Sequence, residues 1–268
     1  MDKKDECVDT RKPSRFYFCS IQLVGSRLQR NKHTAYMMTN RENIEKYCSS
    51  FEEQLAKIQK LEDRLHKKIL LLVILDTLSR ARYPQAKTNK ARFLQLLKEH
   101  IGWKDGQRVS LYRVLLLSPP TNQSKLRDYA QTLVAQWKSW EHPNLTDDPF
   151  KNDIESFADT DDERKLLSDS THLNLLYAYR NHLIHEFREP GQGIETDQRK
   201  KSPHYYPMNH IIQTDEHDER ESWELVYPLG FFVELVESCL RNLKHYLSEN
   251  DLNPYSSYKF GTVWNLRI

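Results

Sequence analysis

The chain has little glycine and lacks the glycine-rich motifs of the common nucleotide-binding folds. Only 7 of its 268 residues are glycine, and no GxGxxG, Walker A or GxSxG pattern occurs. Those patterns supply the tight turns that bring backbone N–H groups to a phosphate or expose a nucleophilic serine. The sequence therefore argues against phosphate-cradling loops and nucleotide folds.

Long apolar runs and paired cysteines are also missing. The longest apolar run is Ile69–Leu75, far shorter than the roughly 20 residues of a membrane-spanning helix. The first residues have no apolar core of the kind that a secretory signal requires. The four cysteines do not have the pair spacing of a metal site. We expect a cytoplasmic protein with reduced thiols, and without a membrane segment, a metal or a cofactor.

The chain is instead rich in charge and in helical periodicity. Charged residues make up 29% of the sequence, and the mean hydropathy is −0.79. Apolar residues recur at helical spacing from Asn40 to Tyr83, where Pro84 ends the pattern. Further helices are predicted over residues 88–102, 125–140, about 161–190 and 228–249. Residues 109–117 fit a short helix or strand, and residues 142–162 have the pattern of an acidic loop.

These patterns predict a mainly helical, all-α fold with one small β insertion. Residues 204–227 contain two short aromatic and β-branched runs around a polar segment, which indicates a β-hairpin. Residues 1–39 are polar and irregular and are expected to form a flexible leader. The helical domain would then cover residues 40–250, with the hairpin inside it. The aromatic tail, residues 251–268, is expected to pack on this body.

Charge is distributed unevenly along the chain. Between Arg80 and Arg113 there are nine basic residues against two acidic ones, whereas between Asp147 and Glu163 eight acidic residues face one lysine. The basic segment is a candidate track for a polyanion such as an RNA backbone. The alternative is a solvated helix face beside an acidic loop. The candidate RNA-backbone residues are Arg80, Arg82, Lys87, Lys90 and Arg92.

The stretch 173–190, LNLLYAYRNHLIHEFREP, carries the most unusual feature of the sequence. Its apolar side chains mark one helical face, yet Arg180 falls in the middle of that face. A buried cation needs a partner or a function. Asn181 follows directly, and His185 lies five residues on, about 140° away around an ideal helix. Either the arginine curls toward the histidine, or two copies of the helix meet across a two-fold interface.

This set of side chains suits cleavage of a phosphodiester by the RNA's own 2′-hydroxyl. A histidine can remove or return a proton near pH 7. An arginine can hold the phosphate and offset the charge that grows in the transition state. An amide such as that of Asn181 can orient the imidazole or the phosphate. Such a reaction does not need a metal.

The pattern R-N-x-x-x-H formed by Arg180, Asn181 and His185 resembles the signature of the HEPN superfamily of RNases. Lys68–Asp76 and Tyr227–Leu247 resemble, more loosely, the neighbouring helices of that family's bundle. The resemblance implies an HEPN-like helical bundle and a metal-independent endoribonuclease with Arg180 and His185 as catalytic residues. It also implies a homodimer in which both pairs line one cleft. Such proteins often act in prokaryotic toxin–antitoxin or antiviral defence systems, which would add an antitoxin or defence protein as a partner.

Other roles for these residues stay open. Arg180 could form a structural ion pair with Asp76 or Glu186, and Asp76 could support Arg180, cap a helix or lie at the surface. His182 could assist at the cleft or lie at a surface. It could also form a metal cluster with His185 and Glu186, although their spacing matches neither HExxH nor HxxEH. Because some family members lack activity, a non-catalytic helical interaction module is the alternative function.

Overall fold

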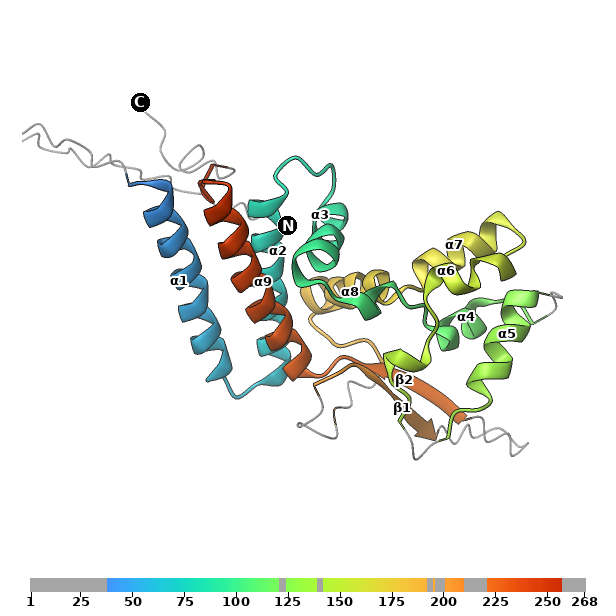
Figure 1. Ribbon diagram of the computed structural model, residues 1–268. Coiled ribbons are helices and arrows are strands. Elements are labelled where there is room, and N and C mark those ends of the chain that lie inside the picture. The colour runs from blue at the N-terminus through green and yellow to red at the C-terminus, as the bar shows by residue number, and fades with distance from the viewer. Residues whose placement is uncertain are drawn as a thin grey trace, which may run out of the picture. The chain divides into compact units, whose positions relative to one another are not determined.

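The computed structural model describes residues 38–120, 124–138, 142–191, 195, 201–209 and 221–256. The chain separates into a unit of residues 1–37, which lies outside the described residues, and a unit that begins at Met38. Nearly all of the predicted leader and the tail from residue 257 therefore lie outside the described part. The described part is mainly helical with a small antiparallel sheet, which confirms the mainly-α prediction (Figure 1).

Three long helices pack side by side to build the first part of the core (Figure 1). They are α1 (Asn40–Gln59), α2 (Arg64–Arg82) and α9 (Leu229–Glu249). The prediction of one continuous helical stretch up to Tyr83 is wrong at residues 60–63. The Asp63 carboxylate accepts a hydrogen bond from the His66 N–H at 2.7 Å, and this cap starts α2 as a separate helix.

The run Ile69–Leu75 is less completely buried than its composition indicates. Leu71, Leu72, Ile74 and Leu75 lie in the core, but Leu70 is 40% exposed and Val73 is 43% exposed. The α2 helix therefore has an apolar strip on its outer face. Within the described residues, no helix combines the length and the apolar composition of a membrane span.

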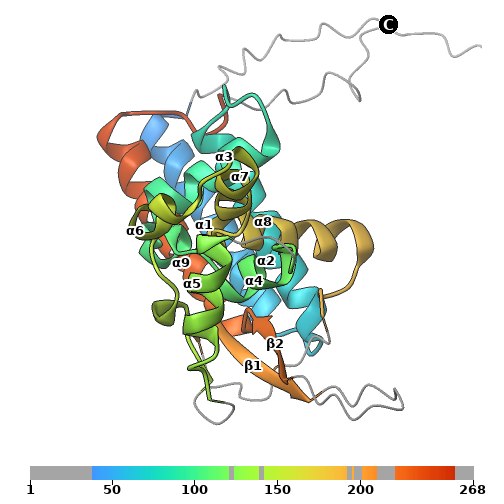
Figure 2. The same ribbon diagram turned by 90° about the vertical axis from the view of Figure 1, so that its right-hand side faces the viewer.

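A second, smaller hydrophobic core is formed by residues between Val109 and Leu167. Figure 2 shows the helices around it facing the viewer. Its helices are α4 (Leu111–Leu117), α5 (Lys125–Val134), α6 (Lys151–Ile154) and α7 (Asp161–Asp169). Residues 142–162, predicted to be an acidic loop, contain α6 and two 3-10 turns, Leu145–Asp147 and Glu155–Phe157. Buried Leu145 and Ile154 explain why this acidic segment is ordered.

The helix predicted over residues 161–190 is two helices and a π-helical turn. After α7 the chain forms α8 (His172–Asn181) and then η5 (His182–Glu186). The break at Thr171 comes from tertiary contacts, because Thr171 pairs with Val109 in a β-bridge and the His172 N–H donates to the Arg108 carbonyl at 3.0 Å. Periodicity within the segment does not reveal such a contact.

The connection from α2 to α4 also contains a π-helical turn. As predicted, Thr88 caps α3 (Asn89–Leu96), and Gly102 ends the following π turn η1 (Leu97–Ile101) at φ 65°. The 3-10 turn η2 (Lys104–Gln107) then leads to α4. The π turn η1 contains His100, a second histidine that contacts an arginine, Arg82.

The predicted hairpin is confirmed. The strands β1 (His204–Asn209) and β2 (Glu221–Val226) pair antiparallel with His204 opposite Val226, and the residues between them lie outside the described part. Tyr205 and Trp223 on the two strands pack against Trp137, with ring centroids 4.5 and 5.4 Å apart. The hairpin thereby attaches to the segment that follows α5.

Candidate functional site

Arg180 and His185 meet within a single chain. The Arg180 Nη1 lies 3.4 Å from the His185 Nε2, and it donates a hydrogen bond to the Asn181 Oδ1 at 2.9 Å. Arg180 is 8% exposed, whereas His185 lies at the surface. The spacing left two geometries open, and the structure has the first: the arginine curls toward the histidine of its own chain. A second copy of the chain is not required for this contact.

The π-helical turn explains how residues five apart come together. The hydrogen bonds of η5 run from residue i to i+5, which widens the helix directly after Arg180 and brings His185 back to the same side. The turn ends at Phe187, whose φ of 55° places a non-glycine residue in the left-handed region. Single π turns of this kind are found frequently at functional sites.

Asp76 on α2 holds Arg180 from the other side. Its Oδ2 accepts hydrogen bonds from the Arg180 Nε, at 2.9 Å, and from Nη2. Burial raises the pKa of Asp76, while the guanidinium of Arg180 opposes that rise. The pair fixes the plane of the guanidinium, so that only Nη1 is turned toward Asn181 and His185. The structural ion pair anticipated as an alternative is thus present, and it also positions the arginine.

Two of the basic residues predicted to contact RNA lie close to this pair. The Tyr177 ring is contacted by two cations, since its centroid lies 5.9 Å from the Lys90 ammonium and 5.8 Å from the Arg180 guanidinium. The charge of Arg92 also opposes the rise that burial causes in the pKa of Asp76. Arg80 and Lys87 are exposed. Basic side chains from α3 therefore stand beside the arginine and histidine.

Arg82 is different, because it belongs to a second arginine–histidine contact. Its Nε donates to the His100 Nε2, and its guanidinium stacks on the Tyr246 ring at 3.7 Å. His100 is buried, and the Tyr83 hydroxyl beside it donates to the Glu99 Oε2 at 2.6 Å. Arg82 is half-buried, and these contacts already engage its guanidinium.

The His100 contact predicts a loss of stability in acid. Burial, and then the Arg82 guanidinium, lower the pKa of His100, so the folded state favours the neutral imidazole. Its contribution to stability is present above pH 6.5 and is lost as pH falls through the lowered pKa, by at most about 1.4 kcal/mol per pH unit. Urea unfolding at pH 7.5 and 5 should show a smaller loss for His100→Gln than for the wild type. An equal loss would contradict the prediction.

His182 points away from the arginine and histidine pair. Its Nδ1 lies 2.7 Å from the Glu186 Oε1, and its side chain lines a cavity on another face of α8. Among the residues that the structure describes, no three His, Cys, Asp or Glu side chains are grouped as metal ligands. The metal cluster weighed for His182, His185 and Glu186 is therefore not formed by the described residues.

A buried lysine anchors the segment after the π turn, and its role was not anticipated. Lys68 is fully buried and pairs with Glu189 at 2.8 Å and with Glu195 at 3.1 Å. The Tyr179 hydroxyl donates to the same Glu189 Oε2 at 2.6 Å. Because Tyr179 precedes Arg180, this cluster ties both ends of the motif to α2. The only sequence signal was a lysine at the start of an apolar run.

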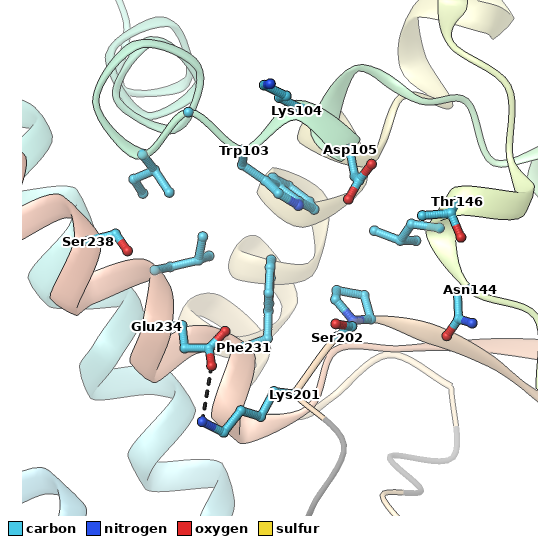
Figure 3. Close-up of a pocket in the computed structure, with 15 residues that line it drawn as sticks. Trp103, Lys104, Asp105, Asn144, Thr146, Lys201, Ser202, Phe231, Glu234 and Ser238 are labelled. Atoms are coloured by element: carbon cyan, nitrogen blue, oxygen red, sulfur yellow. Dashed lines mark ion pairs between the residues drawn. The ribbon is translucent and has the colours of Figure 1, made fainter.

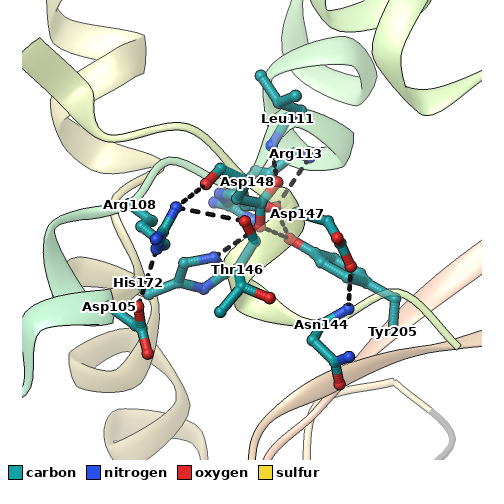
Figure 4. Close-up of polar contacts among 11 residues, drawn as sticks. Asp105, Arg108, Leu111, Arg113, Asn144, Thr146, Asp147, Asp148, His172 and Tyr205 are labelled. Atoms are coloured by element: carbon teal, nitrogen blue, oxygen red, sulfur yellow. Dashed lines mark hydrogen bonds and ion pairs between the residues drawn. The ribbon is translucent and has the colours of Figure 1, made fainter. Parts of the chain in front are cut away.

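A second buried polar network centres on Asp148, which is 1% exposed (Figure 4). Its Oδ2 lies 2.8 Å from the His172 Nε2 and accepts a hydrogen bond from the Tyr205 hydroxyl at 2.6 Å. Its Oδ1 accepts from the Leu111 N–H at 3.0 Å. Burial, followed by the charge of Asp148, raises the pKa of Tyr205. The network joins the start of α8 to α4 and to the hairpin.

Two cavities lie apart from the arginine and histidine pair. The larger, about 670 Å³, opens between η1, η2 and the start of α9, and Figure 3 shows Trp103 and Phe231 in its wall with the Lys201–Glu234 ion pair at its edge. The other, about 410 Å³, lies between α4, α8 and the hairpin. Of the predicted site residues, only His182 lines either cavity.

Comparison with protein-family models, with curated proteins and with solved structures gave no match to this chain.

Proposed function

We propose that the chain is a metal-independent endoribonuclease of the HEPN type. The observation that carries the proposal is the 3.4 Å approach of Arg180 Nη1 to His185 Nε2 on a π turn, with Asn181 on the same guanidinium nitrogen. A fixed guanidinium beside an exposed imidazole matches the needs of phosphodiester cleavage, which are a cation for the phosphate and a group that moves protons.

In the proposed reaction, His185 takes the proton from the RNA 2′-hydroxyl. The freed oxygen attacks the adjacent phosphorus, a 2′,3′-cyclic phosphate forms, and the bond to the 5′ oxygen breaks. That leaving oxygen is protonated by the His185 of a second copy. The Arg180 Nη1 donates to a phosphate oxygen and offsets the growing negative charge. Asp76 keeps the guanidinium in place, and Asn181 supports it from the other side.

The basic residues beside the site support RNA as the substrate. Lys90 and Arg92 flank Arg180 through Tyr177 and Asp76, and exposed Arg80 and Lys87 extend the positive surface. Contacts of this kind bind phosphates without reading the sequence, and they weaken as salt rises.

We propose a homodimer in which the apolar strip on α2, beside the site, is covered by the other copy of the chain. Leu70, Val73 and Phe187 are 40%, 43% and 56% exposed, and Asp76 lies one helical turn after Val73 on α2. Val73→Glu is expected to shift a dimer toward a monomer in light scattering, because it places a charge in an apolar interface. Leu117→Glu, at an exposed leucine on α4, is the matched control and should leave the mass unchanged. A wild-type monomer would contradict the prediction.

The reaction is tested by incubating the purified protein with RNA in excess chelator. Cleavage should persist, and the products should carry a 2′,3′-cyclic phosphate and a 5′-hydroxyl. A substrate with a 2′-deoxy residue at the cut position should be resistant, because it lacks the attacking group. Cleavage that requires added metal, or that cuts the deoxy position, would show that the mechanism is wrong.

The ion pair between Arg180 and Asp76 favours one alternative function. The Asp76 carboxylate neutralises the charge of the buried Arg180 guanidinium and accepts its hydrogen bonds. A purely structural pair in a non-catalytic interaction module would have the same contacts. That module predicts that His185→Ala keeps biological activity while Val73→Glu abolishes it. Growth arrest on expression that His185→Ala relieves would instead favour the enzyme, acting in a toxin–antitoxin or antiviral system with a partner protein.

A further inference from the structure

Tyr177 lies one helical turn before Arg180, on the face of α8 that carries the proposed cleavage site. Side chains three and four positions apart on a helix are neighbours, so Tyr177 shares this face with Arg180 and Asn181. The α8 helix packs here against α3 (Figure 1), and the Phe93 ring of α3 lies 5.7 Å from the Tyr177 ring, tilted by 56°. Phe93 is fully buried and Tyr177 is half-buried, so the tyrosine ring is held by the core and still reaches the surface.

The hydroxyl of Tyr177 is open to solvent and makes no hydrogen bond with any other described residue. The hydroxyl of Tyr179, two positions on, differs in both respects, because Tyr179 is buried and donates to the Glu189 Oε2 at 2.6 Å. Tyr177 can therefore donate its proton to a ligand that approaches from solvent, and no internal hydrogen bond has to break first.

The surroundings of this hydroxyl favour an anion as its acceptor. The Tyr177 ring centroid lies 5.8 Å from the Arg180 guanidinium and 5.9 Å from the Lys90 ammonium. Asp76 offsets the charge of Arg180 through their ion pair. Lys90 is exposed and has no carboxylate partner among the described residues, so it leaves a net positive charge beside the hydroxyl. A hydrogen bond from such a donor is strongest when the acceptor is ionised.

We propose that Tyr177 and Lys90 form a second phosphate-binding subsite, which holds the phosphate next to the one that is cut. The inference rests on the proposed function, in which the Arg180 Nη1 holds the scissile phosphate. The Tyr177 hydroxyl donates to an oxygen of the neighbouring phosphate, and the Lys90 ammonium offsets its charge. Every strand of RNA repeats its phosphates, so the subsite does not read sequence. It selects a polynucleotide over a substrate with a single phosphate.

The first test measures binding without cleavage. A short single-stranded RNA with 2′-O-methyl groups lacks the attacking hydroxyl, and fluorescence anisotropy at several salt concentrations follows its binding. Tyr177→Phe keeps the ring and its contact with Phe93, and it should weaken binding about 10-fold, because a hydrogen bond to a charged acceptor is lost. The variant keeps its charge, so the slope of log K against log salt should not change. Its Tm should equal that of the wild type, since the hydroxyl has no internal partner.

The charge is tested in the same assay with Lys90→Gln. This variant should weaken binding and also reduce the salt slope by about 0.7, the share of one phosphate contact in a single strand. Tyr129→Phe and Lys46→Gln are the matched controls and should bind as the wild type does. Tyr129 is a half-buried tyrosine on α5 whose ring stacks on Phe157 at 4.7 Å, and Lys46 is an exposed lysine on α1.

The second test locates the phosphate. A DNA strand that contains one ribonucleotide can be cut only after that residue, because only this residue has a 2′-hydroxyl. The neighbouring phosphate on the 5′ or the 3′ side is then replaced by a neutral methylphosphonate. On one of the two sides the replacement should slow single-turnover cleavage by the wild type about 10-fold, and it should have little further effect on Tyr177→Phe. Either side supports the subsite and gives the direction of the strand.

The inference is overturned if Tyr177→Phe binds the methylated RNA as tightly as the wild type does, or if the methylphosphonate slows both proteins equally on both sides. Binding that depends on Tyr177 in a protein that does not cleave unmodified RNA would support the subsite and contradict the nuclease. Cleavage that is the same in the wild type and in Tyr177→Phe would do the reverse. A wild type that binds no RNA would contradict both.

Discussion

Replacing Asp148 with alanine is expected to lower the free energy of unfolding by about 3–5 kcal/mol. The substitution leaves the His172 imidazole and the Leu111 N–H buried without their acceptor, and it removes one acceptor from the Tyr205 hydroxyl. Each group stranded in this way costs about 1–3 kcal/mol. That sum is a large part of the roughly 5–15 kcal/mol by which a typical protein is stable. Urea unfolding followed by circular dichroism measures the change.

Two variants show whether the loss comes from this network. Asp148→Asn keeps an acceptor oxygen and the shape of the side chain, so it should cost clearly less than the alanine. Asp153→Ala removes an exposed carboxylate from the same acidic segment and should stay within about 0.5 kcal/mol of the wild type. If Asp148→Ala and Asp153→Ala had equal effects, the buried network would not be a source of stability.

Replacing His185 with alanine is expected to lower the rate of RNA cleavage by about 10²- to 10⁴-fold, the usual contribution of a group that transfers protons. Its side chain is exposed, so the fold and the Tm should be unchanged. Arg180→Lys should also reduce cleavage strongly, because a lysine cannot bond to Asp76, Asn181 and a phosphate at once. Single-turnover rates on one labelled RNA measure both effects.

The control for these variants is His245→Ala, at a histidine on α9 whose side chain is 71% exposed. It should cleave at the wild-type rate. Activity that survives both His185→Ala and Arg180→Lys would assign the cleavage to another site or to a contaminating nuclease. Activity lost together with the folded structure would show that the residues act on stability.

Much of the fold could be predicted because local signals and tertiary structure agree. Thr88 and Pro228 mark helix starts by their own chemistry, and the hairpin is visible in its period. The break between α7 and α8 could not be found in this way. It depends on a bridge between Thr171 and Val109, two residues that are 62 positions apart in the chain.

The site could be predicted in part for a similar reason. Arg180 stood out because it interrupts an apolar face, and its contacts with Asp76, Asn181 and His185 follow that expectation. Asp148 gave no such signal, since it is one of eight acidic residues in its segment and only the fold distinguishes the buried one. The π turn was also hidden, because helical periodicity assumes one constant twist.

The π turn makes the arginine–histidine contact tolerant of a change in chain length. In a regular α-helix, side chains four apart are neighbours, whereas here the wider turn joins residues five apart. Deleting Ile184 would convert the turn to regular helix and keep the two side chains adjacent. The same deletion would rotate the point at which the chain leaves the helix by about 100°, and it would thereby pull Glu189, three residues after the turn, from Lys68. The contact between Arg180 and His185 is therefore expected to survive a one-residue deletion that breaks the buried Lys68–Glu189 ion pair.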